Sequence, residues 1–457
     1  MQNNKFNQLN ISQDMITTLA SLNYNEMTPI QEQSLPFILE GHDIIAQAKT
    51  GSGKTAAFGI GLLNKLNVKR FRIQTMILCP TRELASQVAD ELRRIARFTH
   101  NIKILTLSGG VPYNPQMHSL AHQAHIIVGT PGRILKHLKE QNFTPENIDT
   151  LVLDEADRML DMGFSEDINE IISYLPKQRQ TLLFSATFPT NIETMSNDIL
   201  NNPKIVKVES THSNTTITQE FYKVEDYKRV ESVQKVLNNS QATCVVIFCN
   251  TKIACDELAD DLEDAGLSPL VLHSDLDQRE RNETLVLFAN KSYPILIATD
   301  VAARGLDIKD IDLVINYDLP FENEVYIHRI GRTARAGASG KAVSFVSNEI
   351  QFDELQEYLD TTFTEKNIDT LDSNKKYNMK SQYSTIFING GKKNKVRAGD
   401  ILGALTAGVG LNKDDIGKID ILDLCSYVAV KKEFEQKAFD GLSNGKIKGK
   451  YFRVFLK

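Results

Sequence analysis

The sequence contains no tryptophan, only five cysteines and no long apolar run. A membrane-spanning helix needs about 18 consecutive apolar residues, and no apolar stretch approaches that length. The first ten residues, MQNNKFNQLN, have no basic flank and no apolar stretch, so we expect no signal peptide. The cysteines are scattered without a C-x-x-C pair, which favours free thiols in a reducing cytoplasm over disulfides or a zinc site.

The charge of the chain is unevenly distributed. The 457 residues carry a net charge of −6. Residues 375–457 contain 17 lysine and arginine residues against 8 acidic ones, whereas the rest of the chain contains 35 against 50. A basic tail on an acidic body favours contact of the tail with a polyanion such as nucleic acid, although a lysine-rich surface without a partner would have the same composition.

Apolar, β-branched runs alternate with longer helical patterns across residues 40–350. This alternation predicts an α/β protein with two parallel sheets that are covered on both faces. The segments 77–92 and 247–262 resemble each other, which suggests a duplicated domain, although chance similarity is the alternative. The strands that we expect span residues 75–79, 125–129, 150–154, 181–185, 244–249, 294–299 and 312–317.

A smaller domain follows from residue 379. Its pattern is strand, helix, two strands, helix and strand, the βαββαβ order of an RNA-recognition motif. Phe387 and Tyr427 could present rings for base stacking, or they could belong to the core. The domains that we expect are 1–208 and 221–363, both RecA-like, and 379–457, with linkers at 209–220 and 364–378.

The segment DIIAQAKTGSGKTAAFGIGLL, residues 43–63, has the order strand, glycine loop and helix that a phosphate site requires. Gly51 and Gly53 allow backbone N–H groups to face phosphates, Lys54 can reach the outer phosphates, and the Thr55 hydroxyl can bind Mg²⁺. The loop begins with Ala48 where glycine is usual. The alternative is a glycine turn in which the Lys-Thr pair is incidental.

The segment LVLDEADRMLDMGF, residues 151–164, places three carboxylates directly after an apolar strand. Such a group needs a cation close by, because unpaired buried charge is costly. Asp154 is placed to hold Mg²⁺ through water, and Glu155 to orient or deprotonate the attacking water. An acidic helix N-terminus that is stabilised by the helix dipole would explain one or two of these acids without a ligand.

The segment HRIGRTARAG, residues 328–337, supplies Arg329, Arg332 and Arg335. Arg332 and Arg335 are three residues apart, so one helical face could present both guanidinium groups to a γ-phosphate. The alternative is a basic surface helix.

Together these segments resemble the DEAD-box RNA helicase family, and the resemblance covers the whole two-domain core. The family begins its phosphate loop with alanine, so Ala48 supports the resemblance. The matching segments are TPIQ (28–31), AKTGSGKT (48–55), PTRELA (80–85), SGG (108–110), TPGR (130–133), DEAD (154–157), SAT (185–187), VIFCNT (246–251), DQRER (277–281), ATDVAARGLD (298–307) and HRIGRTARAG (328–337).

The resemblance implies two RecA-like domains that bind ATP, Mg²⁺ and RNA, and an RNA-stimulated ATPase that unwinds duplexes locally. Phe6 would stack on adenine, Gln31 would read its edge, and Asp307 would contact the ribose. Ser185 and Thr187, with Asp157, would couple hydrolysis to domain closure. The residues that it implies for the phosphates and their hydrolysis are Ala48, Lys49, Thr50, Gly51, Ser52, Gly53, Lys54, Thr55, Asp154, Glu155, Arg332 and Arg335.

The resemblance also implies which residues contact RNA. Contacts to phosphates and 2′-hydroxyls would bind RNA without sequence preference. The residues that it implies are Thr81, Arg82, Gly110, Thr130 and Arg133 in the first domain, and Thr251, Gln278, Arg281, Thr299 and Gly305 in the second.

The tail narrows the resemblance to a bacterial branch of the family. Members of that branch bind a hairpin of 23S ribosomal RNA through this domain and act in assembly of the large (50S) subunit. The resemblance rests on INGGKKNKVRAGD (388–400), DDIGKIDI (414–421) and SNGKIKGKYFRV (443–454). The cations that we expect against this RNA are Lys392, Lys393, Lys395, Arg397, Lys446, Lys448 and Lys450.

Two other functions remain open from the sequence alone. ATP could lock the protein on RNA as a clamp that separates no strands, or the protein could be a DNA helicase or translocase. The chain shows no coiled-coil heptads, so we expect a monomer.

Overall fold

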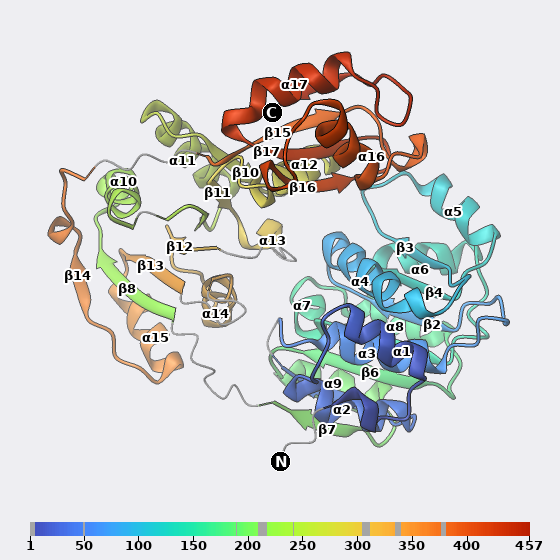
Figure 1. Ribbon diagram of the computed structural model, residues 1–457. Coiled ribbons are helices and arrows are strands. Elements are labelled where there is room, and N and C mark those ends of the chain that lie inside the picture. Colours follow the sequence, from blue (N-terminus) through green and yellow to red (C-terminus); the bar gives the residue numbers. More distant parts are fainter. Residues whose placement is uncertain are drawn as a thin grey trace. The chain divides into compact units, whose positions relative to one another are not determined.

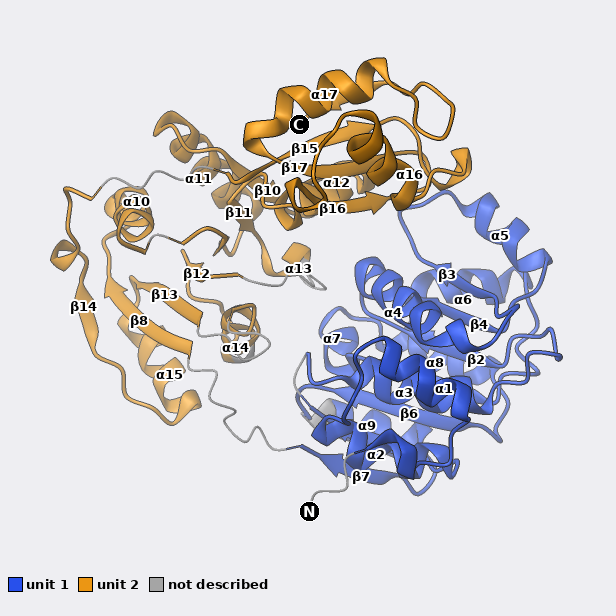
Figure 2. Ribbon diagram, in the orientation of Figure 1, with its two compact units in different colours: residues 1–213 blue, residues 214–457 orange. Residues whose placement is uncertain are grey.

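The computed structural model describes residues 5–48, 51–188, 190–208, 217–240, 242–303, 311–333, 340–375 and 381–457. The chain divides into two compact units, residues 1–213 and 214–457 (Figure 2). No helix of the described ranges combines the length and apolarity that crossing a bilayer requires.

The first unit is built on a seven-stranded parallel sheet in the order β3-β4-β2-β5-β6-β1-β7 (Figure 1). Ile44 and Ala46 of β1 belong to one hydrophobic cluster and Ile45 to another, so both faces of the sheet are buried. The strands are β1 (Ile44–Gln47), β2 (Thr75–Leu78), β3 (Ile104–Leu107), β4 (Ile126–Gly129), β5 (Thr150–Asp154), β6 (Gln180–Ser185) and β7 (Lys204–Lys207).

Helices cover both faces of this sheet. Apolar residues at helical spacing on α4, such as Ala85, Val88 and Leu92, join the same cluster as Ile44. The helices are α1 (Gln13–Ser21), α2 (Pro29–Leu39), α3 (Lys54–Lys65), α4 (Arg82–Ile95), α5 (Tyr113–Ala121), α6 (Pro131–Lys139), α7 (Ala156–Asp161), α8 (Ser165–Tyr174) and α9 (Thr190–Ile199), with short 3₁₀ turns η1 (Phe6–Gln8) and η2 (Ala96–Phe98).

The second unit contains another seven-stranded parallel sheet, in the order β10-β11-β9-β12-β13-β8-β14. Counted from the first strand of each sheet, the two orders are identical, which confirms the predicted pair of parallel-sheet domains. The strands are β8 (Ile217–Lys223), β9 (Val245–Phe248), β10 (Pro269–Leu272), β11 (Ile295–Ala298), β12 (Leu313–Asn316), β13 (Gly340–Val346) and β14 (Glu365–Asn367). The helices are α10 (Arg229–Ser240), α11 (Lys252–Asp264), α12 (Gln278–Ala289), α13 (Asp300–Ala303), α14 (Asn323–Ile330) and α15 (Glu349–Leu359).

Two strands of this sheet lie partly or wholly inside segments that the sequence predicts as linkers. β8 begins at Ile217, within 209–220, and β14 lies within 364–378. Within the described ranges β14 pairs only with β8, so it is an edge strand. Its residues Glu365, Lys366 and Asn367 lack the apolar pattern that identified the central strands, because an edge strand buries less side-chain surface.

The tail forms a four-stranded antiparallel sheet in the order β16-β17-β15-β18. This confirms the predicted βαββαβ order. One sheet face packs against the two helices through residues such as Ile386, Val428 and Leu442. The elements are β15 (Tyr383–Ile388), α16 (Ala398–Gly403), a π-helical turn at Ala404–Gly408, β16 (Ile416–Ile421), β17 (Ser426–Lys431), α17 (Glu435–Asn444) and β18 (Val454–Leu456).

The opposite face of the tail sheet contacts the neighbourhood of α12 in the same unit. Asn290 Nδ2 donates to Thr385 Oγ1 at 3.1 Å, and the Tyr427 hydroxyl donates to Glu283 Oε2 at 3.3 Å. Lys457 forms an ion pair with Glu283. Phe387 and Tyr427 are 7% and 1% exposed, so the interpretation as buried residues holds and their rings are not presented for base stacking.

Candidate functional site

The phosphate loop joins the end of β1 to the start of α3. Gly51 and Gly53 have φ angles of +83° and +94°, which side chains rarely adopt, and a Cβ on Gly53 would lie 2.5 Å from Gln31 Nε2. Lys54 is buried at the first position of α3, and its Nζ donates to the carbonyl oxygen of Ala48 at 2.8 Å. The positive φ angles of both glycines and the position of Lys54 at the start of α3 agree with the predicted phosphate loop.

Gln31 connects helix α2 to this loop. Its Nε2 donates to the Gly53 carbonyl at 3.1 Å, and its Oε1 accepts from the Thr28 backbone N–H at 3.0 Å. Phe6, which the sequence predicts to stack on adenine, is buried on η1 within the first hydrophobic cluster. Thr55 is half-buried on α3, one residue after Lys54, and Ser52 Oγ is buried without a hydrogen-bond partner among the described residues.

Asp154 is the last residue of β5 and is buried. Its Oδ1 has no hydrogen-bond partner within the described residues. Burial raises the pKa of Asp154 to about 7, although the nearby Lys54 charge acts to lower it. A buried carboxylate oxygen that lacks a partner is the kind of ligand that a hard divalent cation takes, so this position fits Mg²⁺.

Glu155 has a φ of +54°, an uncommon value for a residue with a side chain, where the chain turns from β5 into α7. Its Oε2 lies 3.1 Å from Arg158 Nη1, and these two side chains are 7% and 4% exposed. The sequence predicts a role for Glu155 but not its ion pair with Arg158. The spacing of three residues along a helix was the available signal.

Asp157 connects the carboxylate segment to the end of β6. Its Oδ2 accepts hydrogen bonds from the Thr187 backbone N–H at 2.9 Å and the Thr187 hydroxyl at 3.0 Å, and its own N–H donates to Ser185 Oγ at 3.3 Å. Burial alone would raise the pKa of Asp157, but these hydrogen bonds and the Lys54 charge hold it below its ordinary value. The structure thus brings together the three residues that the sequence placed in one network.

The predicted RNA residues of the first unit cluster after the carboxyl ends of β2, β3 and β4. Thr81 and Thr130 are the N-cap residues of α4 and α6. A Cβ on Gly110 would lie 1.5 Å from Arg82 Nη1, so only glycine allows that arginine its place. Arg133 donates to the Val111 carbonyl at 3.2 and 3.3 Å, beside the same loop.

In the second unit, Thr251 is the N-cap of α11, and its Oγ1 accepts from the Ala254 N–H at 3.1 Å. Thr299 follows β11 directly. Gln278 and Arg281 lie on the first turn of α12, and Arg281 donates to the Ala302 carbonyl at 2.6 Å. These residues lie at the corresponding edge of the second sheet.

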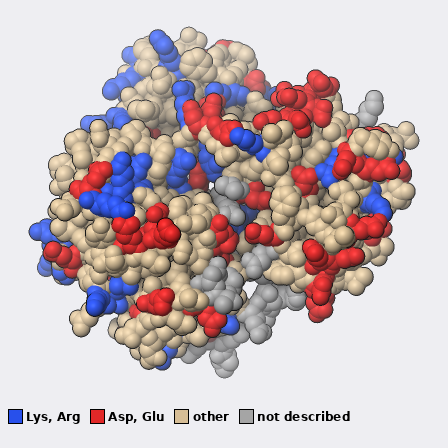
Figure 3. Space-filling view, turned by 180° about the vertical axis from the view of Figure 1, so that it is seen from behind, with Lys and Arg blue, Asp and Glu red and all other residues tan. Residues whose placement is uncertain are grey.

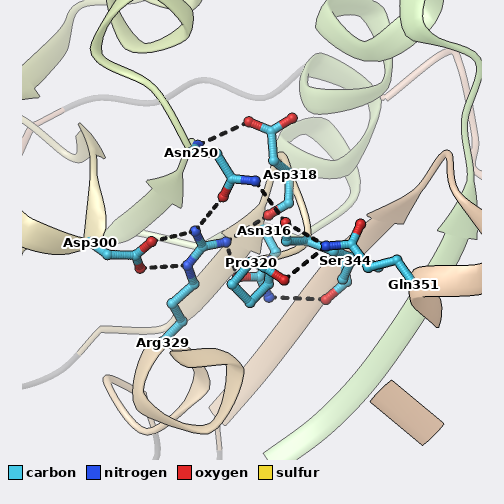
Figure 4. Close-up of polar contacts among 9 residues, drawn as sticks. Asn250, Asp300, Asn316, Asp318, Pro320, Arg329, Ser344 and Gln351 are labelled. Atoms are coloured by element: carbon cyan, nitrogen blue, oxygen red, sulfur yellow. Dashed lines mark hydrogen bonds and ion pairs between the residues drawn. The ribbon is translucent and has the colours of Figure 1, made fainter. Parts of the chain in front are cut away.

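Arg329 on α14 forms a buried network at the carboxyl end of the second sheet (Figure 4). Its Nε and Nη2 contact both carboxylate oxygens of Asp300 at 2.6 and 2.7 Å. Its Nη1 and Nη2 also donate to the Asp318 carbonyl at 2.6 Å and to Asn250 Oδ1 at 2.8 Å. The sequence did not reveal this role, because the partners are separated from Arg329 by between 11 and 79 positions.

Arg332 is buried shortly after this helix. Five predicted site residues, namely Lys49, Thr50, Gly305, Asp307 and Arg335, lie outside the described residues.

The seven basic residues of the tail that the sequence predicts to contact RNA lie on two exposed loops that contact each other. Lys448 Nζ donates to the Lys395 carbonyl at 2.6 Å and lies 3.5 Å from Asp400. The loop after β15 therefore adjoins the loop before β18. The exposed cations of these loops are Lys392, Lys393, Lys395, Arg397, Lys446, Lys448 and Lys450. Figure 3 shows several groups of acidic side chains on this face of the molecule, and the sequence of α11, KIACDELADDLED, is rich in acidic residues.

Three protein families match the chain along most of its length. The DEAD/DEAH box helicase family matches residues 28–195, and the helicase conserved C-terminal domain matches residues 228–337. The chain belongs to the DEAD-box ATP-dependent RNA helicase family. The third match is the DbpA RNA binding domain, over residues 385–455.

Named relatives and solved structures agree with this assignment. The chain is 49% identical over 449 residues to the ATP-dependent RNA helicase DbpA of Escherichia coli (strain K12), with 96% of each chain covered. It is 38% identical to the protein of the same name in Bacillus subtilis (strain 168), with 98% of each covered. A structure of S. cerevisiae Dbp5 bound to RNA and ADP BeF3 matches with a TM-score of 0.73 and 30% identity, over 80% of this chain and 96% of that one.

These comparisons confirm the predicted RecA-like fold, the use of ATP and the helicase activity, and they support RNA binding. They favour an RNA helicase over the DNA helicase alternative, because the family and its named relatives are RNA helicases.

Proposed function

We propose that this helicase unwinds RNA duplexes locally on 23S ribosomal RNA during assembly of the large (50S) subunit, and that its tail domain selects that RNA. The observation that supports this most is the match of residues 385–455 to the DbpA RNA binding domain. The two adjoining basic loops of that domain supply the positive charge that contact with a phosphate backbone requires.

The first unit would bind the triphosphate and direct water to it. Residues 48–55 would hold the phosphates through backbone N–H groups, with Lys54 supplying a positive charge. Glu155 would orient or deprotonate the attacking water. Its Oε2 lies 3.1 Å from Arg158 Nη1, a contact that would hold the carboxylate in one orientation.

Thr55 and Asp154 would hold Mg²⁺, in part through water. The ion, when bound, supplies positive charge that stabilises the phosphates during transfer. The chain would contribute the Thr55 hydroxyl and the Asp154 Oδ1, which has no hydrogen-bond partner among the described residues.

Adenine and ribose recognition would come from Phe6, Gln31 and Asp307, and the guanidinium groups at the γ-phosphate from Arg332 and Arg335. Ser185 and Thr187 would couple hydrolysis to closure. Their bonds to Asp157 give that coupling a direct connection to the carboxylate segment.

RNA would lie along Thr81, Arg82, Gly110, Thr130 and Arg133 on one domain and Thr251, Gln278, Arg281, Thr299 and Gly305 on the other. Phosphate and 2′-hydroxyl contacts of this kind carry little sequence information, so the preference for one RNA must come from the tail.

We also propose that the protein acts as a monomer in the cytoplasm, where its free thiols would stay reduced. The three domains would span 1–208, 221–363 and 379–457, with the second domain extended at its ends by β8 and β14.

The test measures ATP turnover while a 23S ribosomal RNA fragment that contains the hairpin is titrated in. We expect strong stimulation for the parent and a loss of hairpin preference in the variant Lys392→Ala/Lys393→Ala/Lys448→Ala. Lys431→Ala is the control, because it removes a lysine of the same domain at the other end of β15. Lys431 pairs with the first residue of that strand, whereas Lys392 lies in the loop that follows its last residue. Equal stimulation by a hairpin and by an unrelated RNA would refute the proposed selection.

A second test separates unwinding from a clamp that only holds RNA. The Glu155→Gln variant should bind ATP and RNA, hydrolyse no ATP and release no more than one strand per binding event. If the parent hydrolyses ATP yet never releases the short strand of a duplex placed beside the hairpin, the clamp function is correct. Replacing the loading strand by DNA should abolish stimulation, because the 2′-hydroxyl contacts are lost.

A further inference from the structure

The loop Ser108–Val111, which contains Gly110, is held at both ends by the two helices next to it. At its start, Gln116 Nε2 on α5 donates to the Ser108 carbonyl at 2.9 Å. At its end, Arg133 on α6 donates to the Val111 carbonyl at 3.2 and 3.3 Å. The position of the loop therefore depends on how α5 and α6 are fixed relative to each other.

A buried chain of hydrogen bonds fixes the two helices. His137 Nε2 on α6 lies 3.2 Å from Gln116 Oε1, and Asn142 Nδ2 donates to His137 Nδ1 at 3.2 Å. Because Asn142 presents a donor to Nδ1, the ring proton lies on Nε2 and is donated to Gln116. The order Asn142, His137, Gln116, Ser108 is thus a relay in which every group donates to the next.

The surroundings of His137 suit a neutral ring. The side chain is fully buried, and burial together with the Arg133 charge lowers its pKa to about 4. At neutral pH it therefore keeps one donor and one acceptor nitrogen, as the relay requires.

Tyr113 completes the contact between the helices. Its ring stacks on His137 with a centroid distance of 4.4 Å and an interplanar angle of 11°. The Arg133 guanidinium lies 5.5 Å and the Lys136 amine 4.6 Å from the centre of the same ring. The side chain of Arg133 is thereby placed by the ring as well as by the Val111 carbonyl.

We propose that Gln116 and His137 are positioning residues for RNA, which hold the Ser108–Val111 loop and Arg133 in the arrangement that receives the phosphate backbone. The proposal rests on the RNA contacts proposed above for Gly110 and Arg133. Neither Gln116 nor His137 needs to touch RNA, since both are buried beneath the loop.

The competing explanation is that these residues only fill the core. The two explanations differ in their consequences, because a pair of hydrogen-bonding groups can often be replaced by apolar groups of the same shape at little cost in stability. If the pair serves packing alone, apolar replacements should leave RNA binding unchanged.

The experiment uses the full chain with Gln116→Met, His137→Phe and the double variant, in ATP turnover assays with increasing RNA. His137→Phe keeps a ring for stacking on Tyr113 but removes both hydrogen bonds. We expect the RNA concentration for half-maximal turnover to rise about tenfold in each single variant, the loss expected for one hydrogen bond of the relay. kcat at saturating RNA and KM for ATP should stay within about twofold, since the ATP residues are not altered.

The double variant tests the relay directly. Since both substitutions break the same chain of bonds, its half-saturating RNA concentration should be no higher than that of the weaker-binding single variant. If the fold-increases of the two single variants multiply in the double variant, the two residues act independently and the relay is contradicted. If His137→Phe does not fold, Gln116→Met decides the matter, because an unchanged RNA dependence there overturns the proposal.

His125→Phe is the matched control. His125 is also fully buried in the first unit, where Nδ1 accepts from the Lys103 N–H at 3.1 Å and Nε2 lies 3.0 Å from the Val68 carbonyl. It directly precedes the first residue of β4, whereas Thr130 directly follows the last residue of that strand. We expect this variant to lower thermal stability and leave the RNA dependence unchanged.

Arg133→Gln separates failure of this inference from failure of the proposed RNA surface. Suppose that Arg133→Gln raises the RNA concentration for half-maximal turnover while Gln116→Met and His137→Phe leave it unchanged. In that case the positioning role is wrong, but the proposed RNA surface is supported. If none of the three changes RNA dependence, the surface itself is wrong and the positioning role falls with it.

Discussion

The carboxyl edges of the two parallel sheets differ sharply although their strand orders are the same. The fifth strand of the first sheet, β5, ends in Asp154, whose Oδ1 has no partner within the described part of the chain. The fifth strand of the second sheet, β12, ends in Asn316, which donates to Ser344 Oγ at 3.0 Å and receives Arg329 at 3.4 Å. At the first edge, the Asp154 carboxylate can still bind a ligand. At this part of the second edge, the polar side chains form hydrogen bonds with one another.

This difference shows how two domains with the same strand order can have different roles. Unmet buried polar groups cost stability and persist where a ligand repays the cost. A closed network such as that of Arg329 stiffens the edge from which other groups act. The comparison can be tested by disturbing each edge separately.

The largest effect is expected at the first edge. Lys54→Ala removes the cation of the phosphate loop, and ATP turnover should fall by about a thousandfold, the upper range for loss of one group that stabilises transition-state charge. Steady-state turnover at saturating RNA measures this. Lys65→Ala, at the exposed end of the same helix, should turn over ATP as the parent does.

At the second edge the expected effect is on stability. Arg329→Met leaves Asp300 and Asn316 without their buried partner, and the free energy of unfolding should drop by about 3–5 kcal/mol. Urea unfolding followed by circular dichroism measures it. Arg94→Met, which breaks an ion pair at a half-exposed surface, should cost at most about 1 kcal/mol. If Arg329→Met and Arg94→Met lose the same free energy of unfolding, the buried network stabilises the protein no more than a surface ion pair does.

The pH dependence of Asp154 gives a third prediction. Its folded pKa of about 7 lies above the ordinary value, so the folded state holds the proton more tightly and stability is lost as pH rises from about 4 through 7. Asp154→Asn removes that loss. Without nucleotide, the variant should gain stability over the parent as pH rises, by about 4 kcal/mol at most at pH 8. Melting temperatures at pH 5 and pH 8 measure this, and a constant difference would contradict the assignment.

The smallest expected effect concerns the two threonines that cap equivalent helices. Thr81 and Thr251 accept hydrogen bonds from the third residue beyond them at 3.3 and 3.1 Å. Thr81→Ala and Thr251→Ala should each cost about 1 kcal/mol of unfolding free energy. The costs should match, because the caps are alike. Unequal costs would show that the two edges differ even in local helix stability.

The sequence predicted the central strands and the phosphate loop because both have local signatures. The strands are continuous apolar runs, and the loop has glycines at fixed offsets from Lys54. It could not predict the Arg329 network or the relay through His137, because each joins residues that are far apart in the chain. The sequence predicts a linker where the edge strand β14 lies for a related reason, since the few polar residues of this strand carry no apolar pattern.

The tail rings illustrate a different limit. Phe387 and Tyr427 lie opposite each other in the register of β15 and β17, a placement that the alternation of strand residues allows one to expect. The alternation of residues along a strand does not show which part of the protein covers the sheet face on which both rings lie. The cover is supplied by α12 and its neighbours, from another domain of the same unit.

That covered face has a thermodynamic consequence. Thr385, Tyr427 and Lys457 meet Asn290 and Glu283 across a surface that must be exposed if the tail melts alone. Heat should therefore denature residues 217–457 in a single cooperative transition, and a protease that cuts between the domains should leave the two fragments associated. Two well-separated calorimetric peaks within this part of the chain would show that the surface is too weak to link them.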